Sequence, residues 1–249
     1  MRRDGAVNSA ASWWRIAAGV LGPRWMVRAR CLLRGKPLPR WGNLRRTRPF
    51  STEFGSDRGT PIDRYYLDQV LTKYRRHITG RVLEIQMATY THRFGHDVTA
   101  SHTVDVNPKF QPTYQCDLAH AEGVIPSDAY DCFLMPSTLQ HLRELEPALA
   151  TALRVVRPGG AILATAAGLI PLIDDGADYW RMSAAGWEEV AARVWPGCTI
   201  EVAGHGNSLA AIAALHGIAV EELEPAELDV YDRRYPVLVS IVCRKPQPA

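Results

Sequence analysis

Three acidic residues stand at or just beyond the ends of short segments that read as buried strands. They are Glu84, Asp105 and Asp117. If these strands run parallel, their carboxyl ends share one edge of a sheet, where open α/β folds bind ligands. We predict that Asp105 accepts the hydroxyls of a ribose, and that Asp117 accepts an amino group from a ring that packs on Leu118. The alternatives are a turn-forming role for Asp105 and a helix cap at Asp117.

A histidine follows the fourth such segment. Pro136 and Ser137 come directly after Met135, and His141 lies four residues beyond Ser137. Because an unperturbed imidazole titrates near neutral pH, His141 is our candidate for the general base that takes a proton from a substrate hydroxyl. His92 is a competing candidate. For either one the alternative is an ordinary structural histidine on a helix.

An aromatic and polar group in the C-terminal half is our candidate for an acceptor pocket. It comprises Tyr179, Trp180 and Arg181, together with Asn207 further along the chain. Aromatic faces suit a sugar ring or a flat ring system. The alternative is core packing for the aromatic residues and a strand-end hydrogen bond for Asn207.

Several other kinds of catalytic centre have no support in the sequence. It contains no GxSxG motif of a serine hydrolase and no GxxxxGK[ST] phosphate loop. Cys116 and His120 lack a second ligand pair at suitable spacing, so we predict no metal site. The five cysteines include no CxxC pair, which argues against a disulfide framework and fits a reducing cytoplasm.

The elements that must position these residues alternate between strand and helix patterns. Strands are predicted over residues 81–85, 103–106, 113–116, 130–135, 161–165, 199–202 and 237–243. Helices are predicted from Thr60 to Gly80 and over residues 139–153, 183–194, 207–215 and 221–228, with a break at Pro147 as the alternative for the second of them. This alternation predicts an open, mostly parallel sheet with helices on both faces.

Three segments carry a resemblance to a known superfamily. Ala129–Leu134, Leu139–Leu142 and Leu153–Leu163 resemble the fourth strand, the following helix and the Pro-Gly-Gly turn of class I S-adenosylmethionine-dependent methyltransferases of the type 11 kind. The resemblance implies an α/β, Rossmann-like fold. Its seven-stranded sheet would be mostly parallel with the last strand antiparallel. It also implies S-adenosyl-L-methionine as cofactor.

A narrower resemblance extends from about Trp41 to Lys245. Residues 57–66, 90–95, 178–183 and 206–207 are similar to segments of bacterial methyltransferase-like proteins. Those proteins are often associated with glycosyltransferases and with surface-sugar or natural-product pathways. This resemblance implies a small hydroxylated or sugar-containing acceptor.

The superfamily resemblance also implies roles for residues around the cofactor. Glu84 would orient the loop after the first strand and the amino group of the cofactor, and Pro136 and Ser137 would lie near the transferred methyl group. Gln86-Met87-Ala88 stands where the superfamily has a glycine-rich turn, whose glycines let the backbone approach the cofactor. The side chain of Gln86 would either hydrogen-bond the amino-acid end of the cofactor or occlude it.

Three functions follow from these observations and stay open at the level of sequence. The first is methyl transfer from S-adenosylmethionine to a small hydroxylated or sugar-containing acceptor. The second is a non-catalytic partner or scaffold of a glycosyltransferase, which the lost glycine turn favours and the acids at three strand ends oppose. The third is a cofactor-binding enzyme of non-methylating chemistry.

The charge distribution divides the chain in two. Residues 1–48 contain 12 Lys and Arg and one acid, whereas the remaining residues contain 17 Lys and Arg and 25 Asp and Glu. We therefore predict a basic N-terminal arm over residues 1–48 and a methyltransferase-like domain over residues 49–249. In the arm, short helices are predicted around Ser12–Val20 and Arg24–Arg34.

The arm mixes arginines with tryptophans, which suits an anionic membrane surface or an acidic protein partner. The alternative is an arm that folds back on the acidic body. Nucleic acid is disfavoured because no recognised binding module accompanies the charge. The longest charge-free apolar run, Ala161–Ile173, is shorter than the roughly 20 residues that span a bilayer. We expect a cytoplasmic protein, peripheral to the inner membrane face if the arm binds lipid.

Overall fold

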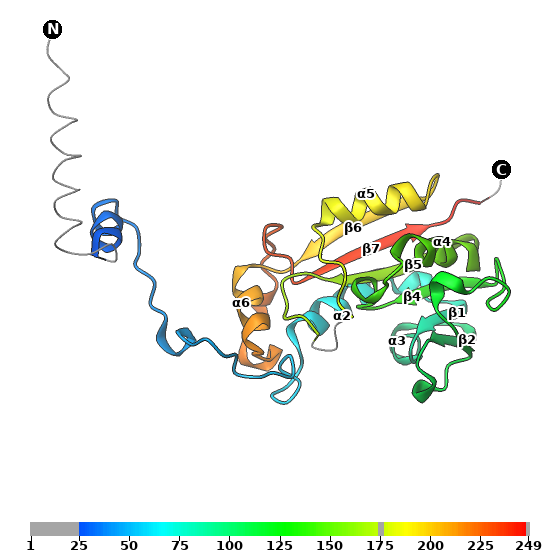
Figure 1. Ribbon diagram of the computed structural model, residues 1–249, viewed down its shortest axis with the longest axis horizontal. Helices are drawn as coiled ribbons and strands as arrows, with labels where there is room; N and C mark the ends of the chain where they lie inside the picture. Colours follow the sequence, from blue (N-terminus) through cyan, green and yellow to red (C-terminus); the bar gives the residue numbers. More distant parts are fainter. Residues whose placement is uncertain (1–24, 174–176, 248–249) are drawn as a thin grey trace, which may run out of the picture. The chain divides into compact units, whose positions relative to one another are not determined.

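The computed structural model describes residues 25–173 and 177–247 and divides into two units, Met1–Thr47 and Arg48–Ala249 (Figure 1). In the first unit, residues 25–33 are helical, where a helix was predicted over Arg24–Arg34, and a 3-10 turn, η1, covers Gly42–Leu44. The helix predicted over Ser12–Val20 lies outside the described residues. No helix among the described residues is long and apolar enough to span a bilayer.

One sheet organises the described part of the second unit, with seven strands in the order β3-β2-β1-β4-β5-β7-β6. The strands are β1 Gly80–Ile85, β2 Val98–Asp105, β3 Tyr114–Gln115, β4 Tyr130–Met135, β5 Val156–Ala167, β6 Thr199–His205 and β7 Leu238–Arg244. β1 to β5 run parallel to one another, and β7 is antiparallel to both β5 and β6. This confirms the predicted mostly parallel sheet with an antiparallel last strand.

Helices cover both faces of this sheet (Figure 1). They are α2 Ile62–Tyr74, α3 Thr89–Phe94, α4 Leu145–Val155, α5 Ala184–Val194, α6 Ser208–His216 and α7 Pro225–Leu228. Alternate residues of β4 point to opposite faces, so Cys132 and Leu134 join the core under α2 and α6, whereas Phe133 and Met135 join the core under α4 and α5. Burial on both sides explains why this strand is apolar except at Asp131.

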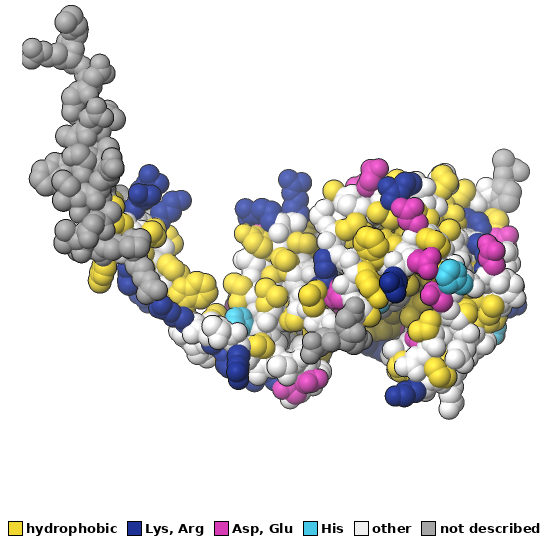
Figure 2. Space-filling view, viewed as in Figure 1, with side chains coloured by type: hydrophobic (Ala, Val, Ile, Leu, Met, Phe, Trp, Pro, Cys, Tyr) yellow, Lys and Arg dark blue, Asp and Glu magenta, His cyan; other side chains and the backbone are white. Residues whose placement is uncertain are grey.

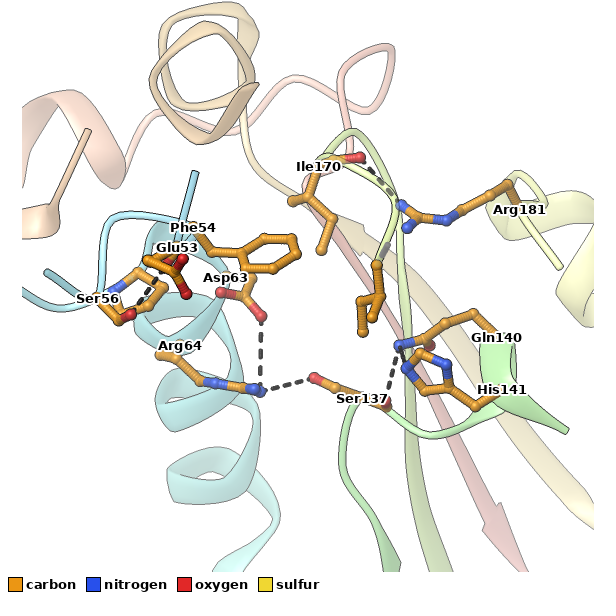
Figure 3. A pocket seen from close by; sticks show the side chains of 12 residues that line it. Glu53, Phe54, Ser56, Asp63, Arg64, Ser137, Gln140, His141, Ile170 and Arg181 are labelled. Atoms are coloured by element: carbon orange, nitrogen blue, oxygen red, sulfur yellow. Dashed lines mark hydrogen bonds and ion pairs between the residues drawn. The ribbon is translucent and has the colours of Figure 1, made fainter. Parts of the chain in front are cut away.

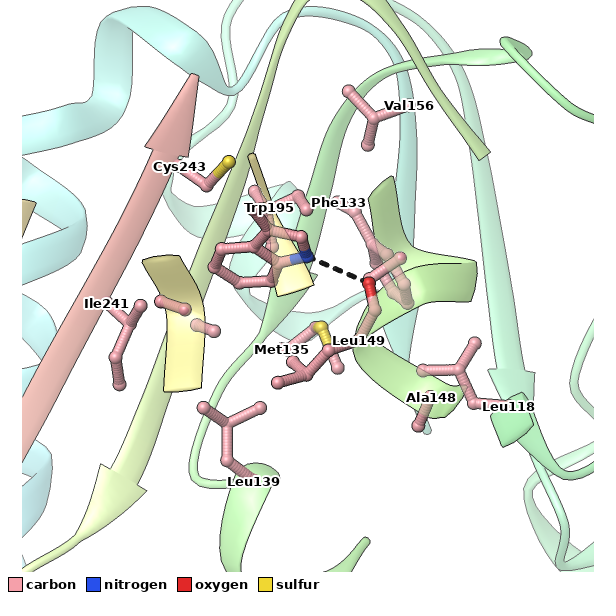
Figure 4. Packing of buried hydrophobic residues seen from close by; sticks show 14 of the residues in the cluster. Leu118, Phe133, Met135, Leu139, Ala148, Leu149, Val156, Trp195, Ile241 and Cys243 are labelled. Carbon is pink, nitrogen blue, oxygen red and sulfur yellow. Dashed lines mark hydrogen bonds between the residues drawn. The ribbon is translucent and has the colours of Figure 1, made fainter. Parts of the chain in front are cut away.

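Two tryptophans of the α5 region fill the core on the α4 and α5 face. Trp187 and Trp195 are both buried, and Nε1 of Trp195 donates to the carbonyl oxygen of Leu149 over 2.9 Å (Figure 4). The bond ties the end of α5 to α4. Truncating such a ring to alanine costs about 3–5 kcal/mol, so this contact fixes how the two helices lie on the sheet.

The predicted helix over residues 139–153 is broken. A 3-10 turn, η5 Leu139–His141, is followed by α4, which starts at Leu145. Pro147 explains the break, because its ring is tolerated in the first turn of a helix but clashes with a helical residue four positions earlier. His141 therefore lies on a short turn at the end of β4, and not on a long helix.

The Pro-Gly-Gly turn that was predicted before the fifth strand is part of β5 itself. The β4–β5 pairing shifts register between Tyr130 and Cys132, and Gly159 has a φ of +80°. A Cβ on Gly160 would lie 2.7 Å from the carbonyl oxygen of Asp131. Glycine thus allows a bulge where the backbones approach closely, and the strand continues through it.

Candidate active site

The turn after β1 keeps a backbone conformation that glycine adopts easily. Gln86 has a φ of +69°, and its N–H donates to the carbonyl oxygen of Val104 on β2 over 2.9 Å. For a residue with a side chain this left-handed conformation costs roughly 1–2 kcal/mol. The turn has therefore kept the shape of a glycine turn and gained a side chain.

Glu84 supports this turn from below. Its side chain is fully buried, and its carboxylate accepts hydrogen bonds from the N–H of Tyr90 (2.9 Å), the N–H of Thr91 (2.8 Å) and the hydroxyl of Thr91 (2.6 Å). These donors belong to the first turn of α3. Burial raises the pKa of the Glu84 carboxyl, although the three hydrogen bonds act in the opposite direction. Glu84 thus fixes the start of α3 and thereby the turn, and its contact with the amino group of a cofactor stays a prediction.

Asp105 and Asp117 occupy neighbouring strand ends, because Asp105 ends β2 and Asp117 follows the adjacent β3. Oδ1 of Asp105 accepts from the N–H of Asn107 over 2.6 Å, and Oδ1 of Asp117 accepts from the N–H of Ala119 over 2.9 Å. The turn and cap roles are thus both present. They do not exclude a ligand, since a carboxylate has about four acceptor positions on two oxygens. Leu118 is buried beside the exposed Asp117.

A cavity of about 320 Å³ opens at the same edge of the sheet, between the start of α2 and the ends of β4 and β5 (Figure 3). The side chains around it are Glu53, Phe54, Ser56, Pro61, Asp63, Arg64, Ser137, Gln140, His141, Ile170, Ile173 and Arg181. The volume suits a small molecule.

One ion-paired arginine spans the wall of this cavity (Figure 3). Nη1 of Arg64 donates to the hydroxyl of Ser137 over 2.8 Å and lies 3.6 Å from Oδ2 of Asp63. Ser137 has a φ of +47°, and its N–H donates to the hydroxyl of Thr165 over 2.7 Å. The strained backbone at Ser137 turns its side chain toward α2, so the end of β4 and the start of α2 are held together across the site.

The hydrogen bonds around His141 specify its tautomer. Nδ1 faces the carbonyl oxygen of Ala177, and Nε2 lies 3.0 Å from the side-chain nitrogen of Gln140. A carbonyl oxygen only accepts and an amide nitrogen only donates, so the proton is on Nδ1 and the lone pair is on Nε2. Oε1 of Gln140 accepts from the N–H of Ala167 over 3.1 Å, which fixes the orientation of the amide. His141 is thus set up as a base at Nε2.

Arg181 holds the segment that closes the far side of the cavity. Its guanidinium pairs with Asp178 and donates to the carbonyl oxygens of Gly168 (2.8 Å), Ile170 (3.2 Å) and Pro171 (3.2 Å). The hydrogen bond from Arg181 lowers the pKa of the Asp178 carboxyl. Arg181 therefore lines the predicted pocket, but its guanidinium hydrogen-bonds residues that form the cavity wall.

The other three residues predicted to bind the acceptor lie outside the cavity lining. Tyr179 is 45% exposed, and Nε1 of Trp180 donates to the carbonyl oxygen of Leu142 over 2.7 Å. Asn207 is buried: its side-chain oxygen caps α6 at the N–H groups of Leu209 and Ala210. Its side-chain nitrogen donates to two backbone carbonyls. These contacts correct the prediction for Asn207, whose amide is used within the fold.

His92, the competing candidate for a base, is exposed on α3 and is not among the residues that line the cavity. Among the described residues no group of three or more His, Cys, Asp or Glu side chains has the arrangement of a metal site. The ionisable side chains in the cavity lining are Glu53, Asp63, Arg64, His141 and Arg181.

Comparison with known proteins agrees with this geometry. Residues 73–164, which run from the end of α2 into β5, match the family model described as a methyltransferase domain. This part of the body therefore resembles a methyltransferase domain. No curated protein matches the chain. S-adenosylmethionine is the cofactor of this methyltransferase superfamily.

Solved structures of S-adenosylmethionine-dependent methyltransferases share the fold of this chain. An S-adenosylmethionine-dependent methyltransferase from Archaeoglobus fulgidus superposes with a TM-score of 0.50 at 14% identity, over 74% of this chain and 94% of its own. One from Mesorhizobium loti gives 0.50 at 15% identity, over 74% and 98%. At these identities the likeness concerns the fold alone.

The residue types at the strand ends of this sheet are compatible with S-adenosylmethionine at two of three positions. Asp105 ends β2 and Asp117 follows the adjacent β3, where carboxylates suit the hydroxyls of a ribose and the amino group of an adenine. At the end of β1, the Cβ of Gln86 takes up space that a glycine would leave open beside the amino-acid end of the cofactor.

Sequence reasoning missed most of the cavity wall. Phe54, Asp63, Arg64 and Gln140 line the site, yet none was a candidate. The one available signal was the run Asp63-Arg64 in the first turn of α2, within a segment that marks the narrower resemblance. Residues 53–56 reach the strand ends through tertiary contacts, which leave no signal in the sequence.

Proposed function

We propose that this protein transfers a methyl group from S-adenosylmethionine to a hydroxyl of a small, sugar-containing or otherwise hydroxylated acceptor bound in the 320 Å³ cavity. One observation carries the proposal: His141 lines the cavity, and the hydrogen bonds of its ring to Gln140 and Ala177 leave the lone pair on Nε2. Such an atom is suited to accept a hydroxyl proton.

The cofactor would be held at the carboxyl ends of four strands. Asp105 would accept the ribose hydroxyls, Asp117 would accept the adenine amino group, and Leu118 would pack against the ring. Pro136 and Ser137 would form the floor between cofactor and acceptor. When bound, S-adenosylmethionine supplies a methyl group on a positively charged sulfur, which is open to direct displacement.

The chain's own residues then position the acceptor and move one proton. The acceptor hydroxyl takes the place of the Gln140 amide as donor to Nε2 of His141, and its proton ends on that nitrogen. Nδ1–H keeps its bond to the Ala177 carbonyl, and the nearby Asp178 carboxylate stabilises the imidazolium. Alignment in a closed site supplies most of the acceleration, so one base is sufficient.

A second function rests on the turn after β1. If the Gln86 side chain excludes the cofactor, the domain acts as a non-catalytic partner or scaffold, for which a glycosyltransferase is the candidate partner. The basic arm would then be its docking element, through an acidic protein surface or an anionic membrane. A cofactor-binding enzyme of non-methylating chemistry is the remaining alternative.

Calorimetric titration of the full chain with S-adenosylmethionine and with its demethylated product separates these functions. Methyl transfer predicts saturable binding of both, followed by methylation of members of a panel of hydroxylated sugars and aromatic hydroxyl compounds. Loss of methylation in a His141→Ala variant that still binds cofactor would support the assigned base. No binding at millimolar cofactor favours the scaffold, and binding without methylation favours other chemistry.

A further inference from the structure

A buried carboxylate lies in the cavity wall at the start of α2. Asp63 is only 9% exposed, and it lines the cavity. Among the described residues its ion-pair partner is Arg64, with Nη1 3.6 Å from Oδ2, and no group there donates a hydrogen bond to the carboxylate. A carboxylate has about four acceptor positions, and a charge that is buried without hydrogen bonds is costly. The donors that satisfy Asp63 therefore come from the contents of the cavity.

The loop before α2 adds a second carboxylate and an aromatic ring. Glu53 and Phe54 line the cavity on the same side as Asp63, and Gln140 and His141 lie across from them (Figure 3). The exposed carboxylate of Glu53 has no hydrogen bond or ion pair within the described part of the chain. Carboxylates and an aromatic face are the groups that bind a protonated amine, through charge-assisted hydrogen bonds and cation–π attraction.

Hydrogen bonds hold this loop in place. Oγ of the buried Ser51 accepts from the N–H of Glu53 over 3.0 Å and from the N–H of Gly55 over 3.2 Å, and it donates to Asp57. Phe54 has a φ of +57°, a left-handed conformation that is rare for a bulky residue. The side chains of Glu53 and Phe54 are thus positioned by the fold before a ligand binds.

The charge balance of the cavity favours a cation. Its lining contains two carboxylates and two guanidinium groups, and a further carboxylate, that of Asp178, pairs with Arg181. The ring of His141 is neutral, because Nδ1 carries its proton and Nε2 its lone pair. Carboxylates therefore outnumber positively charged groups around the cavity.

The surroundings of the loop are acidic as well. Arg58 pairs with Glu222, whereas Asp57 and Glu221 accept hydrogen bonds from neutral donors. Residues 49–249 contain 17 Lys and Arg against 25 Asp and Glu, and Figure 2 shows Asp and Glu side chains spread over the body. A negative field of this kind raises the local concentration of a cationic ligand and lowers that of an anionic one.

We propose that the acceptor carries a protonated amino group, as an amino sugar or a hydroxylated aromatic amine does, and that Asp63, Glu53 and Phe54 bind this group. The inference rests on the methyl transfer proposed above and names the class of its substrate. With the amine held on the α2 side of the cavity, a hydroxyl of the same molecule faces Nε2 of His141 on the other side.

Binding of the amine by two carboxylates also determines which atom is methylated. Nearby negative charge favours the protonated form of an amine, and a protonated amine has no lone pair with which to attack a methyl group. The hydroxyl gives its proton to Nε2 of His141 while its oxygen bonds to the methyl carbon and the bond from that carbon to sulfur breaks. The products are a methyl ether, an imidazolium and a neutral thioether, so methylation is expected on oxygen and not on nitrogen.

Binding is tested by NMR titration of the full chain with two matched pairs of compounds, D-glucosamine with N-acetyl-D-glucosamine and tyramine with N-acetyltyramine. At least one amine is expected to bind about ten-fold or more tightly than its N-acetyl form, because acetylation removes the charge. The pair that shows the larger difference identifies the sugar or the aromatic amine as the acceptor class. D-glucuronic acid, which is anionic, is expected to bind more weakly than D-glucosamine.

Two variants assign the difference to the carboxylates. Asp63→Asn is expected to weaken amine binding about ten-fold or more and to leave the N-acetyl compounds unaffected. Glu53→Gln is expected to weaken amine binding about three-fold, because an exposed charge is screened by solvent. It tests the same effect at an exposed position if Asp63→Asn fails to fold. Glu189→Gln, which changes an exposed acid on α5, is the matched control and should bind as the unmutated protein does.

The proposal is overturned if both N-acetyl compounds bind as tightly as the amines, if D-glucuronic acid binds best, or if neither amine binds at tens of millimolar. It is also overturned if the preference for amines survives in the folded variants. These outcomes are distinct from failure of the methyl transfer itself. Methylation of neutral hydroxylated compounds with kcat and KM unchanged by Asp63→Asn would leave the proposed function standing without the amine site. Amine binding that depends on Asp63, without any methylation, would leave the amine site standing without the proposed function.

Discussion

The side-chain nitrogen of Gln140 lies 3.0 Å from Nε2 of His141, its neighbour in sequence. Gln140 is only 3% exposed, and its oxygen is held by the N–H of Ala167. The position of the amide is thus set by the backbone of β5, and the amide in turn sets the ring of His141. An acceptor hydroxyl that displaces the amide meets a lone pair that is already oriented.

Replacing His141 with alanine should lower the rate of methyl transfer by about 10²- to 10⁴-fold, the usual contribution of a general base. Cofactor affinity should stay unchanged, because His141 lies on the acceptor side of the site. Steady-state kinetics and calorimetry measure the two effects. His96→Ala, at an exposed position outside the cavity, serves as control. Equal rates in both variants would show that His141 is not the base.

Replacing Asp105 with alanine should weaken S-adenosylmethionine binding roughly 10- to 100-fold. A charge-assisted hydrogen bond contributes about 1.5–3 kcal/mol, and each 1.4 kcal/mol corresponds to about tenfold in affinity. Calorimetric titration measures the change. Glu188→Ala removes an exposed acid on α5 and should leave affinity as it is. If both variants bind alike, the ribose is held elsewhere.

Replacing Gln86 with glycine should tighten cofactor binding and keep the protein folded. Glycine adopts the observed φ of +69° without strain. The strain relieved, about 1–2 kcal/mol, is offset in part by the greater freedom of glycine in the unfolded chain. The free energy of unfolding measured in urea should therefore change by less than about 1 kcal/mol. Weaker binding in this variant would instead show that the Gln86 amide grips the cofactor.

Stability should fall in mild acid because of His205. Burial lowers its pKa from 6.5 to about 4, so between these pH values the unfolded chain binds the proton and the folded protein does not. Unfolding free energy then decreases as pH falls, by roughly 1.4 kcal/mol per pH unit within this window.

The matched variant is His205→Gln, which keeps a polar group beside the hydroxyl of Ser240, 2.8 Å from Nε2 in the unmutated protein. Between pH 7 and pH 5 the unmutated protein should lose about 2 kcal/mol more than this variant in urea unfolding. Parallel pH profiles would mean that His205 titrates normally.

The sheet could be predicted because its signals are local. A strand such as β4 is covered on both faces, so every residue from Tyr130 to Met135 except Asp131 is buried, and the run is visible in the sequence. The break before α4 was an open alternative at Pro147, and the bulge in β5 was not predicted. The break depends on Pro147. The bulge depends on the close approach of the β4 and β5 backbones at Gly160, which becomes apparent only when the two strands are paired.

The site was predicted less completely than the sheet. Ser137, at the end of β4, could be found because parallel strands bring their carboxyl ends together, whereas the role of Asp105 stays a prediction. Asn207 was assigned to the acceptor although its amide caps α6, because capping and binding use the same chemistry. Phe54 and Arg64 come from segments before the first strand, and their place in the cavity depends on packing between distant parts of the chain.

The shortness of β3 affects how firmly the adenine end of the site is built. β3 has two residues, Tyr114 and Gln115, and pairs only with β2 at the margin of the sheet. β1, by contrast, is enclosed by two neighbours. Amide protons around Asp117 should consequently exchange with solvent through small local openings, and those of β1 only through global unfolding. A ligand that bridges both regions would slow exchange mainly at β3, where order is gained on binding.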